Sequence, residues 1–200
     1  MSIYALKPRF QSMLRPLTAW LARAGVTANQ VTAAACLISL VVAGFVAWNS
    51  HERWPFLLIP LWMFLRMAFN AIDGMLAREF GQKTRLGAYL NELTDVISDT
   101  ALYLPFALVA PFALWSVGLV VLLAAISEYA GILGLMVGAS RRYDGPMGKS
   151  DRAFVFGAIG LWIGVSDSLP EWAFYVIVLM AMALVHTIAN RVRRGLAEGH

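Results

Sequence analysis

Long apolar runs separated by short polar stretches make up most of the chain. Apolar side chains dominate six segments: 30–48, 55–77, 88–109, 113–139, 153–165 and 172–189. A helix of about 20 mostly apolar residues crosses the hydrocarbon core of a bilayer. The pattern therefore predicts an all-α integral membrane protein with six transmembrane helices. The fifth segment is short for a span unless its helix begins near Lys149.

Residues 1–25 follow a different pattern. Apolar side chains recur at roughly helical spacing between residues 3 and 23 and are interrupted by basic ones. Because a basic amphipathic helix typically lies in the membrane interface, we expect an interfacial amphipathic helix in 1–25, followed by the six-helix membrane domain in 26–200. Pro8 and Pro16 disfavour a continuous straight helix here. The alternative is an ordinary helix packed on the membrane domain.

The composition excludes several classes of protein. Hydrophobic residues make up 60% of the 200 residues and charged residues 14%, against about 25% charged in average soluble domains. A water-soluble globular domain and a disordered chain are therefore excluded. The single cysteine, Cys36, excludes an intrachain disulfide and a cysteine-rich metal site.

Basic residues mark one side of the predicted membrane domain. The net charge is +4, and all Lys and Arg except Arg53 and Arg66 fall in the N-terminal segment, the C-terminal tail or the loops 78–85 and 141–152. Basic residues collect on the cytoplasmic side of a membrane. We therefore predict that both termini are cytoplasmic, and we interpret the positive charge as topology rather than as nucleic-acid binding.

Polar residues inside the apolar segments indicate a functional site, because ionisable groups in hydrocarbon are costly. Asn70 and Asp73 stand three residues apart on one helical face, and Gly87, Asn91 and Asp95 follow one another at intervals of four. Two neighbouring antiparallel helices would present these oxygen atoms to each other near the cytoplasmic surface. Hard cations such as Mg²⁺ prefer oxygen ligands and often share them with a substrate phosphate.

This stretch resembles the signature of the CDP-alcohol phosphotransferase (CDP-alcohol phosphatidyltransferase) family, integral membrane enzymes of phospholipid synthesis. The family pattern is D-x2-D-G-x2-A-R-x8-G-x3-D-x3-D. Six of its eight fixed positions match at unbroken spacing, namely Asp73, Gly74, Ala77, Arg78, Gly87 and Asp95. Two weaker elements of the family also have counterparts in this chain. Asn29 and Thr32 resemble the first element, and Gly148, Lys149 and Arg152 resemble the second.

The resemblance implies a reaction and a set of roles. A phosphatidyl group would pass from CDP-diacylglycerol to an alcohol acceptor with release of CMP, in the bacterial cytoplasmic (inner) membrane and often in a homodimer. The general base would be Asp95. A divalent metal, Mg or Mn, would be held by Asp73, Asp95, Asn70 and Asn91. The CDP group would be bound by Asn29, Asp73, Gly74, Ala77, Arg78 and Gly87.

Asn70 and Asn91 depart from the family pattern, because they replace its first and third aspartates. The remaining Asp73 and Asp95 carry a charge of −2, which balances one Mg²⁺, so we expect one metal rather than two, or weaker affinity. The chain is then a divergent active enzyme, a degenerate CDP-lipid-binding or scaffold protein, or an engineered double variant. The retained signature residues favour an active enzyme. The resemblance is closest to a bacterial branch with Asn at both positions, which argues against engineering.

The acceptor is expected to contact a basic cytoplasmic loop. Lys149, Arg152 and Arg142 are the candidate acceptor-binding residues, of which the first two match the family element. Such a cluster suits an acceptor phosphate, as in glycerol 3-phosphate or inositol phosphate, although the same charges are also explained by topology alone. Asp151 stands where the family element is usually basic, so a neutral alcohol or sugar stays open as well.

Three further charged residues lie deeper in the apolar segments. Arg66, Asp99 and Glu128 each stand twelve residues, or about 18 Å, inward from the predicted cytoplasmic edge. Equal depth predicts a buried network that supports the site, because unpaired charges there would be costly. A small transporter is the remaining alternative, but the polar residues stop about halfway across and no inverted repeat is visible.

Overall fold

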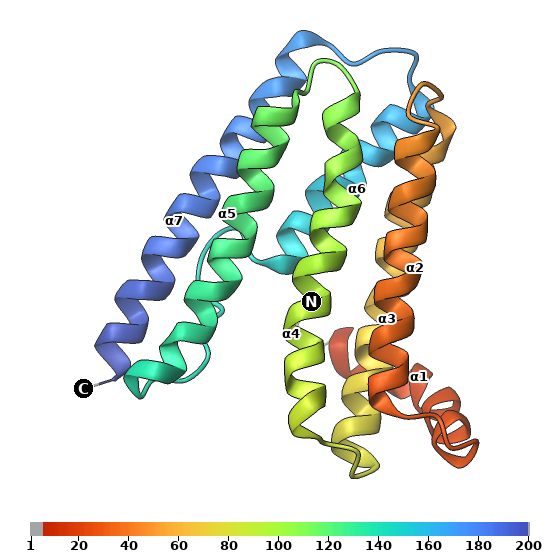
Figure 1. The fold of residues 1–200 in the computed structure, drawn as a ribbon, viewed down its shortest axis with the longest axis vertical. Coiled ribbons are helices and arrows are strands. Elements are labelled where there is room, and N and C mark those ends of the chain that lie inside the picture. Colours follow the sequence, from red (N-terminus) through yellow and green to blue (C-terminus); the bar gives the residue numbers. More distant parts are fainter. Residues whose placement is uncertain (1–5, 200) are drawn as a thin grey trace. The chain divides into compact units, whose positions relative to one another are not determined.

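The computed structural model describes residues 6–199, which contain helices and no strand. The α-helices are α1 (Leu6–Arg23), α2 (Ala28–Trp48), α3 (Leu58–Glu79), α4 (Arg85–Tyr103), α5 (Leu114–Leu133), α6 (Lys149–Val165) and α7 (Phe174–Glu198) (Figure 1). Short 3-10 helices lie between them: η2 (Trp54–Leu57), η3 (Leu104–Leu108), η4 (Gly134–Val137) and η5 (Glu171–Ala173). The predicted all-α class is confirmed.

Four of the six predicted spans are long and apolar enough to cross a membrane. They are Ala28–Trp48, Trp54–Glu79, Leu114–Val137 and Glu171–Glu198. The other two predicted spans, 88–109 and 153–165, coincide with α4 and α6. α4 carries four charged residues, Arg85, Glu92, Asp95 and Asp99, and α6 has only 17 residues. α6 does begin at Lys149, the start that the sequence required, but the count of six spans stays a prediction.

The described residues form two compact units, which are treated separately below. The first contains the residues up to Val41 and those from Trp62 to Ser98, and the second contains Val42 to Leu61 and the residues from Asp99 onward. All six matching residues of the signature, and both asparagines, lie in the first unit.

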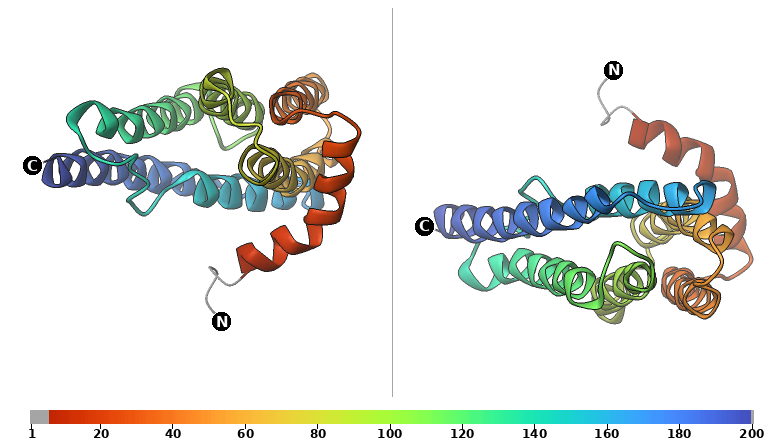
Figure 2. Two further views of the ribbon diagram at one scale, coloured as in Figure 1. Left: turned by 90° about the horizontal axis from the view of Figure 1, so that it is seen from below. Right: turned by 90° about the horizontal axis from the view of Figure 1, so that it is seen from above.

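In the first unit, α1 runs across α2 and α3 rather than along them (Figure 2). Its apolar residues Leu14 and Leu21 pack against a core that includes Val31 of α2 and Met75 and Leu76 of α3. On another side of α1, three large apolar side chains are exposed, those of Met13, Leu17 and Trp20. α1 is one helix with Pro16 inside it, and it is bent rather than straight (Figure 2), as expected from its prolines.

In the second unit, α5 and α7 lie side by side (Figures 1 and 2). α6 packs on η2, where Gly160 lies close to the carbonyl of Phe56. Aromatic rings fill the space around α6: Tyr103 stacks on Phe156 with ring centroids 4.0 Å apart, and Phe106 contacts the same Phe156 ring. This close packing fixes the part of α6 that carries the buried arginine described below.

Candidate functional site

An ion pair between α3 and α4 sets the register of the signature hairpin. The short loop 80–84 joins the two helices, so they are antiparallel. Arg66 Nη2 lies 3.1 Å from the carboxylate Oδ1 of Asp95 and 3.3 Å from its carbonyl oxygen. The Arg66 side chain is 8% exposed and that of Asp95 22%. The predicted general base is thus held by a guanidinium within the first unit.

This contact aligns the other signature positions of α3 and α4. Antiparallel helices advance equally in opposite directions, so Asn70, one turn beyond Arg66, stands at about the level of Asn91. Gly74, one turn further, stands at about the level of Gly87. Asn70 is half-buried and Asn91 exposed. The two asparagines that replace family aspartates are therefore brought to the same height of one hairpin.

Asp73 is tied to α2. Its carboxylate is buried, and Oδ2 accepts a hydrogen bond of 2.8 Å from the Thr32 hydroxyl. The Thr32 oxygen also lies 3.0 Å from the carbonyl of Ala28, one turn earlier in α2. Thr32 orients this signature carboxylate, although it was not among the predicted site residues. Its place three residues after Asn29, in the weaker family element, is the signal that pointed to it.

Gly74 provides room for Arg78 at the end of α3. A Cβ at position 74 would lie 2.9 Å from Nη2 and 3.1 Å from Nη1 of Arg78, so the guanidinium lies directly over the glycine. Arg78 is exposed, and Ala77 beside it is half-buried. A larger residue at position 74 would displace the Arg78 guanidinium from this place along the helix.

Asn29, Thr84 and Gly87 meet where α4 begins. Thr84 precedes the helix, and its hydroxyl oxygen accepts a 2.8 Å hydrogen bond from the Gly87 amide, which is a side-chain N-cap. The same oxygen accepts a 3.3 Å bond from Asn29 Nδ2. A Cβ at Gly87 would lie 2.7 Å from Asn29 Oδ1. Sequence reasoning missed Thr84, although a threonine just before a helix is a recognised capping signal.

The predicted metal ligands form an all-oxygen donor set. Two carboxylates, Asp73 and Asp95, and two amides, Asn70 and Asn91, come from facing helices of one unit, and such donors suit a hard divalent cation. The positive charge of Arg66 lies beside the negative charge of Asp95. Among residues 6–199, no group of three or more His, Cys, Asp or Glu is placed to hold a metal ion, and the number of cations stays a prediction.

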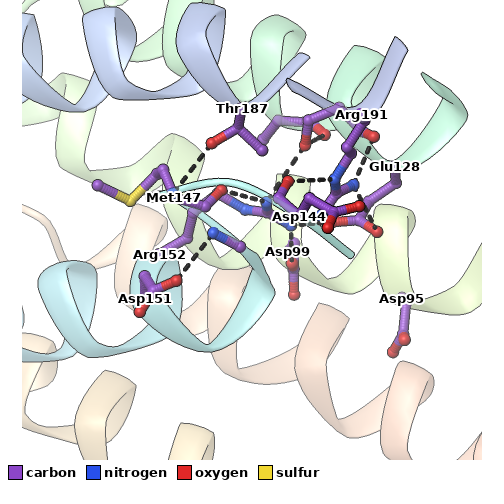
Figure 3. A network of polar contacts seen from close by, with 12 residues as sticks. Asp95, Asp99, Glu128, Asp144, Met147, Asp151, Arg152, Thr187 and Arg191 are labelled. Carbon is purple, nitrogen blue, oxygen red and sulfur yellow. Dashed lines mark hydrogen bonds and ion pairs between the residues drawn. The ribbon is translucent and has the colours of Figure 1, made fainter. Parts of the chain in front are cut away.

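The second unit holds a separate buried network centred on Arg152. Its Nη2 lies 2.9 Å from Glu128 Oε1 and 3.4 Å from Asp99 Oδ2, and its side chain is 1% exposed (Figure 3). We predicted a network of Asp99 and Glu128 with Arg66. Within the second unit, Arg152 joins these two carboxylates. Within the first unit, Arg66 contacts Asp95, and its predicted place in the network with Asp99 and Glu128 stays a prediction.

The three predicted acceptor-binding residues lie in the second unit and have different surroundings. Arg152 is buried as described. Arg142 Nη2 lies 2.7 Å from Asp144, and its Nη1 contacts Glu198 near the end of α7. Lys149, at the start of α6, is half-buried. Two of the three predicted phosphate ligands are therefore bound to carboxylates of the chain itself.

Asp144 anchors the loop between η4 and α6. It binds Arg142 and also Arg194, whose Nη1 lies 2.9 Å from Asp144 Oδ1. Burial raises the pKa of Asp144, but the hydrogen bond and charge of Arg142, together with the charge of Arg194, lower it more, so the net pKa lies below its ordinary value. The carboxylate is thus held in its charged form between two guanidiniums.

Arg191 was interpreted only as a topology marker, yet it is almost fully buried. Its Nη1 lies 3.4 Å from Glu128 Oε2, and its side chain is 2% exposed. The signal was present in the helical spacing, because Leu184, Thr187 and Arg191 continue the buried face of α7 at intervals of three and four. A charged residue that falls on the apolar stripe of a helix predicts a buried partner.

Comparisons with known proteins agree with the signature. The CDP-alcohol phosphatidyltransferase family profile matches residues 25–192. The chain is 44% identical to the inner membrane protein YnbA of Escherichia coli K12 over 193 residues, which is 96% of each chain. It is 26% identical to a phosphatidylinositol phosphate synthase of Corynebacterium glutamicum over 199 residues, 96% of this chain and 87% of the other.

The fold is shared with solved structures of a Mycobacterium tuberculosis phosphatidylinositol phosphate synthase. The form with CDP-DAG bound has a TM-score of 0.73 at 23% identity, covering 90% of this chain and 92% of that one. The form in complex with manganese and citrate has a TM-score of 0.74 at 22% identity, covering 90% and 87%. These likenesses establish the helical fold in which the signature hairpin occurs.

Proposed function

Because the chain belongs to the CDP-alcohol phosphatidyltransferase family, we propose that it transfers a phosphatidyl group from CDP-diacylglycerol to the hydroxyl of an alcohol. The candidate acceptors are glycerol 3-phosphate and other polyols. One observation carries the proposal: both retained signature carboxylates are oriented by neighbouring side chains, Asp73 by Thr32 and Asp95 by Arg66. A decayed site would not need to keep these contacts.

The reaction forms one bond and breaks one. The acceptor oxygen attacks the phosphorus that carries the diacylglycerol, and the bond from that phosphorus to CMP breaks. Asp95 takes the acceptor proton, and Arg66 positions its carboxylate for this step. Asp73 and Asp95, with the amides of Asn70 and Asn91, would hold a divalent cation, Mg²⁺ or Mn²⁺, and such a cation would neutralise negative charge on the pyrophosphate.

The nucleotide is assigned to the end of the hairpin where α3 finishes and α4 begins. Gly74 and Ala77 leave room for a ligand to approach α3, and Arg78 is exposed and able to bind phosphate. Asn29 and Gly87 are held together by the Thr84 cap. These are the positions that match the family pattern, and together they make the proposed CDP site.

The proposed location is the bacterial inner membrane, with six spans and both termini in the cytoplasm. The similarity to an inner membrane protein of Escherichia coli supports the membrane, and the distribution of Lys and Arg supports the orientation. The exposed apolar residues of α1, which runs across α2 and α3, support its assignment as an interfacial helix.

A CMP-release assay tests the function. Purified protein is incubated with CDP-diacylglycerol, Mg²⁺ or Mn²⁺ and a panel of alcohols, and CMP is quantified. We expect release with at least one acceptor, and a loss of about 10²–10⁴-fold in Asp95→Asn. Asp167→Asn, which removes an exposed carboxylate outside the site, is the matched control. Full turnover by Asp95→Asn would contradict the assignment of the base.

The replacement of two family aspartates by Asn70 and Asn91 favours one alternative, a CDP-lipid-binding protein without turnover. The same assay distinguishes the two functions. Binding of CDP-diacylglycerol without CMP release, for every acceptor and both metals, would establish the binding protein and exclude the transferase.

A further inference from the structure

Three guanidinium groups converge on the single carboxylate of Glu128 in the second unit. Arg152 Nη2 lies 2.9 Å from Oε1, and Arg191 Nη1 and Arg141 Nη2 lie 3.4 and 3.5 Å from Oε2. The carboxylate extends from α5, and the arginines come from α6, α7 and the segment after η4. Figure 3 shows Glu128 between Arg152 and Arg191.

This cluster has the composition of an oxyanion site. Several arginines around one group of acidic oxygens is the arrangement that proteins use to bind phosphate. The side chains of Arg152 and Arg191 are 1% and 2% exposed, so both guanidinium groups are buried. Here both oxygens of the chain's own Glu128 occupy the position that a phosphate would take.

A phosphate could enter only by displacing Glu128. The Glu128 side chain is 11% exposed, so it would lose three cationic partners without reaching water. A buried charge stripped of its partners is strongly destabilising. The neighbouring Arg142 also has carboxylate partners, because it contacts Asp144 and Glu198. Four of the arginines in and around the loop 141–152 are therefore already bound to carboxylates of the chain itself.

We propose that Glu128 is a built-in anion that closes this three-arginine site, and that the acceptor is an uncharged hydroxyl compound, such as an alcohol, a polyol or a sugar. The second half of this proposal rests on the proposed transferase function. It narrows the acceptors left open there by excluding those that carry a phosphate. The first half concerns the second unit alone and is tested separately.

The acceptor is tested with the wild-type protein. CMP release is compared between glycerol and glycerol 3-phosphate, and between inositol and inositol phosphate. We expect the uncharged member of a pair to react at least about tenfold faster. Faster reaction of the phosphorylated member would overturn the proposal while upholding the transferase. Absence of CMP release with every acceptor would instead refute the transferase. Phosphate binding to the wild type and to Glu128→Gln would then decide whether Glu128 closes the three-arginine site.

The built-in anion is tested with inorganic phosphate and a Glu128→Gln variant. Thermal unfolding in detergent is followed as phosphate is raised, with chloride at matched ionic strength as the reference. A ligand that binds only the folded state raises the melting temperature. We expect phosphate to stabilise Glu128→Gln but neither the wild type nor Glu171→Ala, a control that removes an exposed carboxylate of η5.

Stabilisation of the wild type by phosphate, beyond that by chloride, would show an open anion site and overturn the proposal. Failure of phosphate to stabilise Glu128→Gln would show that Glu128 does not close such a site, and this result would also overturn the proposal. If Glu128→Gln does not fold, the wild-type measurement and the acceptor comparison still decide the proposal, since neither uses the variant.

Discussion

At the scale of single residues, the two units hold their charges in pairs inside largely apolar surroundings. Arg66 with Asp95, and Arg152 with Glu128, are both nearly buried. Such pairs seldom add much net stability, but the loss of one partner leaves a buried charge without compensation. The value of each pair therefore lies in holding a carboxylate in one position.

Replacing Arg66 with Met should destabilise the protein by about 3–5 kcal/mol, because the Asp95 carboxylate loses its guanidinium. The melting temperature of the purified protein in detergent measures this effect. The double variant with Asp95→Asn should recover part of the loss, since the carboxylate charge that Arg66 contacted is then removed. Arg193→Met, at an exposed position of α7, is the control, and a wild-type melting temperature for Arg66→Met would refute the role.

Asp144 should contribute stability that depends on pH. Its pKa in the folded protein lies below the ordinary value of 3.8, so its contribution is complete above that value and is lost as the pH falls through the lower folded pKa. We expect Asp144→Asn to lower stability at neutral pH by about 1–2 kcal/mol. The difference from wild type should shrink below pH 3.8.

Unfolding of the two proteins between neutral pH and pH 3 measures this shrinkage, and Asp167→Asn serves as the control at an exposed position. A difference that stays constant over the whole range would show that the Asp144 carboxylate is not stabilised by its arginines.

The sequence predicted the positions of the signature residues on their helices but not the side chains that they contact. Spacing alone placed Asp73 and Asp95 on facing helices, because helical periodicity is a local property. Partners such as Thr32 for Asp73 depend on how separate helices pack, which no spacing encodes. Arg66 could have reached several carboxylates at similar depth, and only the structure identifies Asp95 as one that it contacts.

At the scale of elements, the fold of the second unit depends on close approach of the loop after η4 to α5. The Arg142 amide donates a 3.0 Å hydrogen bond to the carbonyl of Gly131. A Cβ at position 131 would lie only 2.6 Å from the Arg142 carbonyl oxygen and 3.2 Å from Arg191 Nη1. Glycine at this position is therefore needed for the loop and the arginine to fit.

Gly131→Ala should cost about 1–3 kcal/mol, because the backbone of the loop must move to admit the methyl group. Gly118→Ala is a matched control on the same helix, where a Cβ meets nothing within 4 Å. The control should leave stability unchanged or slightly raised, since alanine is the better helix former. Equal melting temperatures for the two variants would contradict the close approach.

The positions of the helices were well predicted. All six apolar segments correspond to helices, because a long apolar run has few alternatives to a helix in a membrane. The sequence also identified Lys149 as the start that α6 needs. Pro16 removes one hydrogen bond of α1, so the helix continues on both sides of it but is bent, as the sequence predicted (Figure 2).

At the scale of the whole molecule, the proposed six-span topology has a direct test. Cys36 is the only cysteine and is buried, so Cys36→Ala gives a background without thiols. In that background we expect His51→Cys to react with a membrane-impermeant maleimide on intact cells. Lys83→Cys should react only after permeabilisation, because its loop carries the basic residues typical of the cytoplasmic side. Labelling of Lys83→Cys on intact cells, with His51→Cys labelled only after permeabilisation, would show the opposite orientation in the membrane.

The ion pair between Arg66 and Asp95 also has a consequence for how the chain enters the membrane. An isolated α4 would pay about 3 kcal/mol for each carboxylate brought to the bilayer centre, and it carries Asp95 and Asp99. α3 is synthesised first and brings Arg66 into the translocon ahead of them. The two helices are therefore expected to leave the translocon together as a hairpin, and a change at Arg66 should reduce the yield of inserted protein before it reduces catalysis.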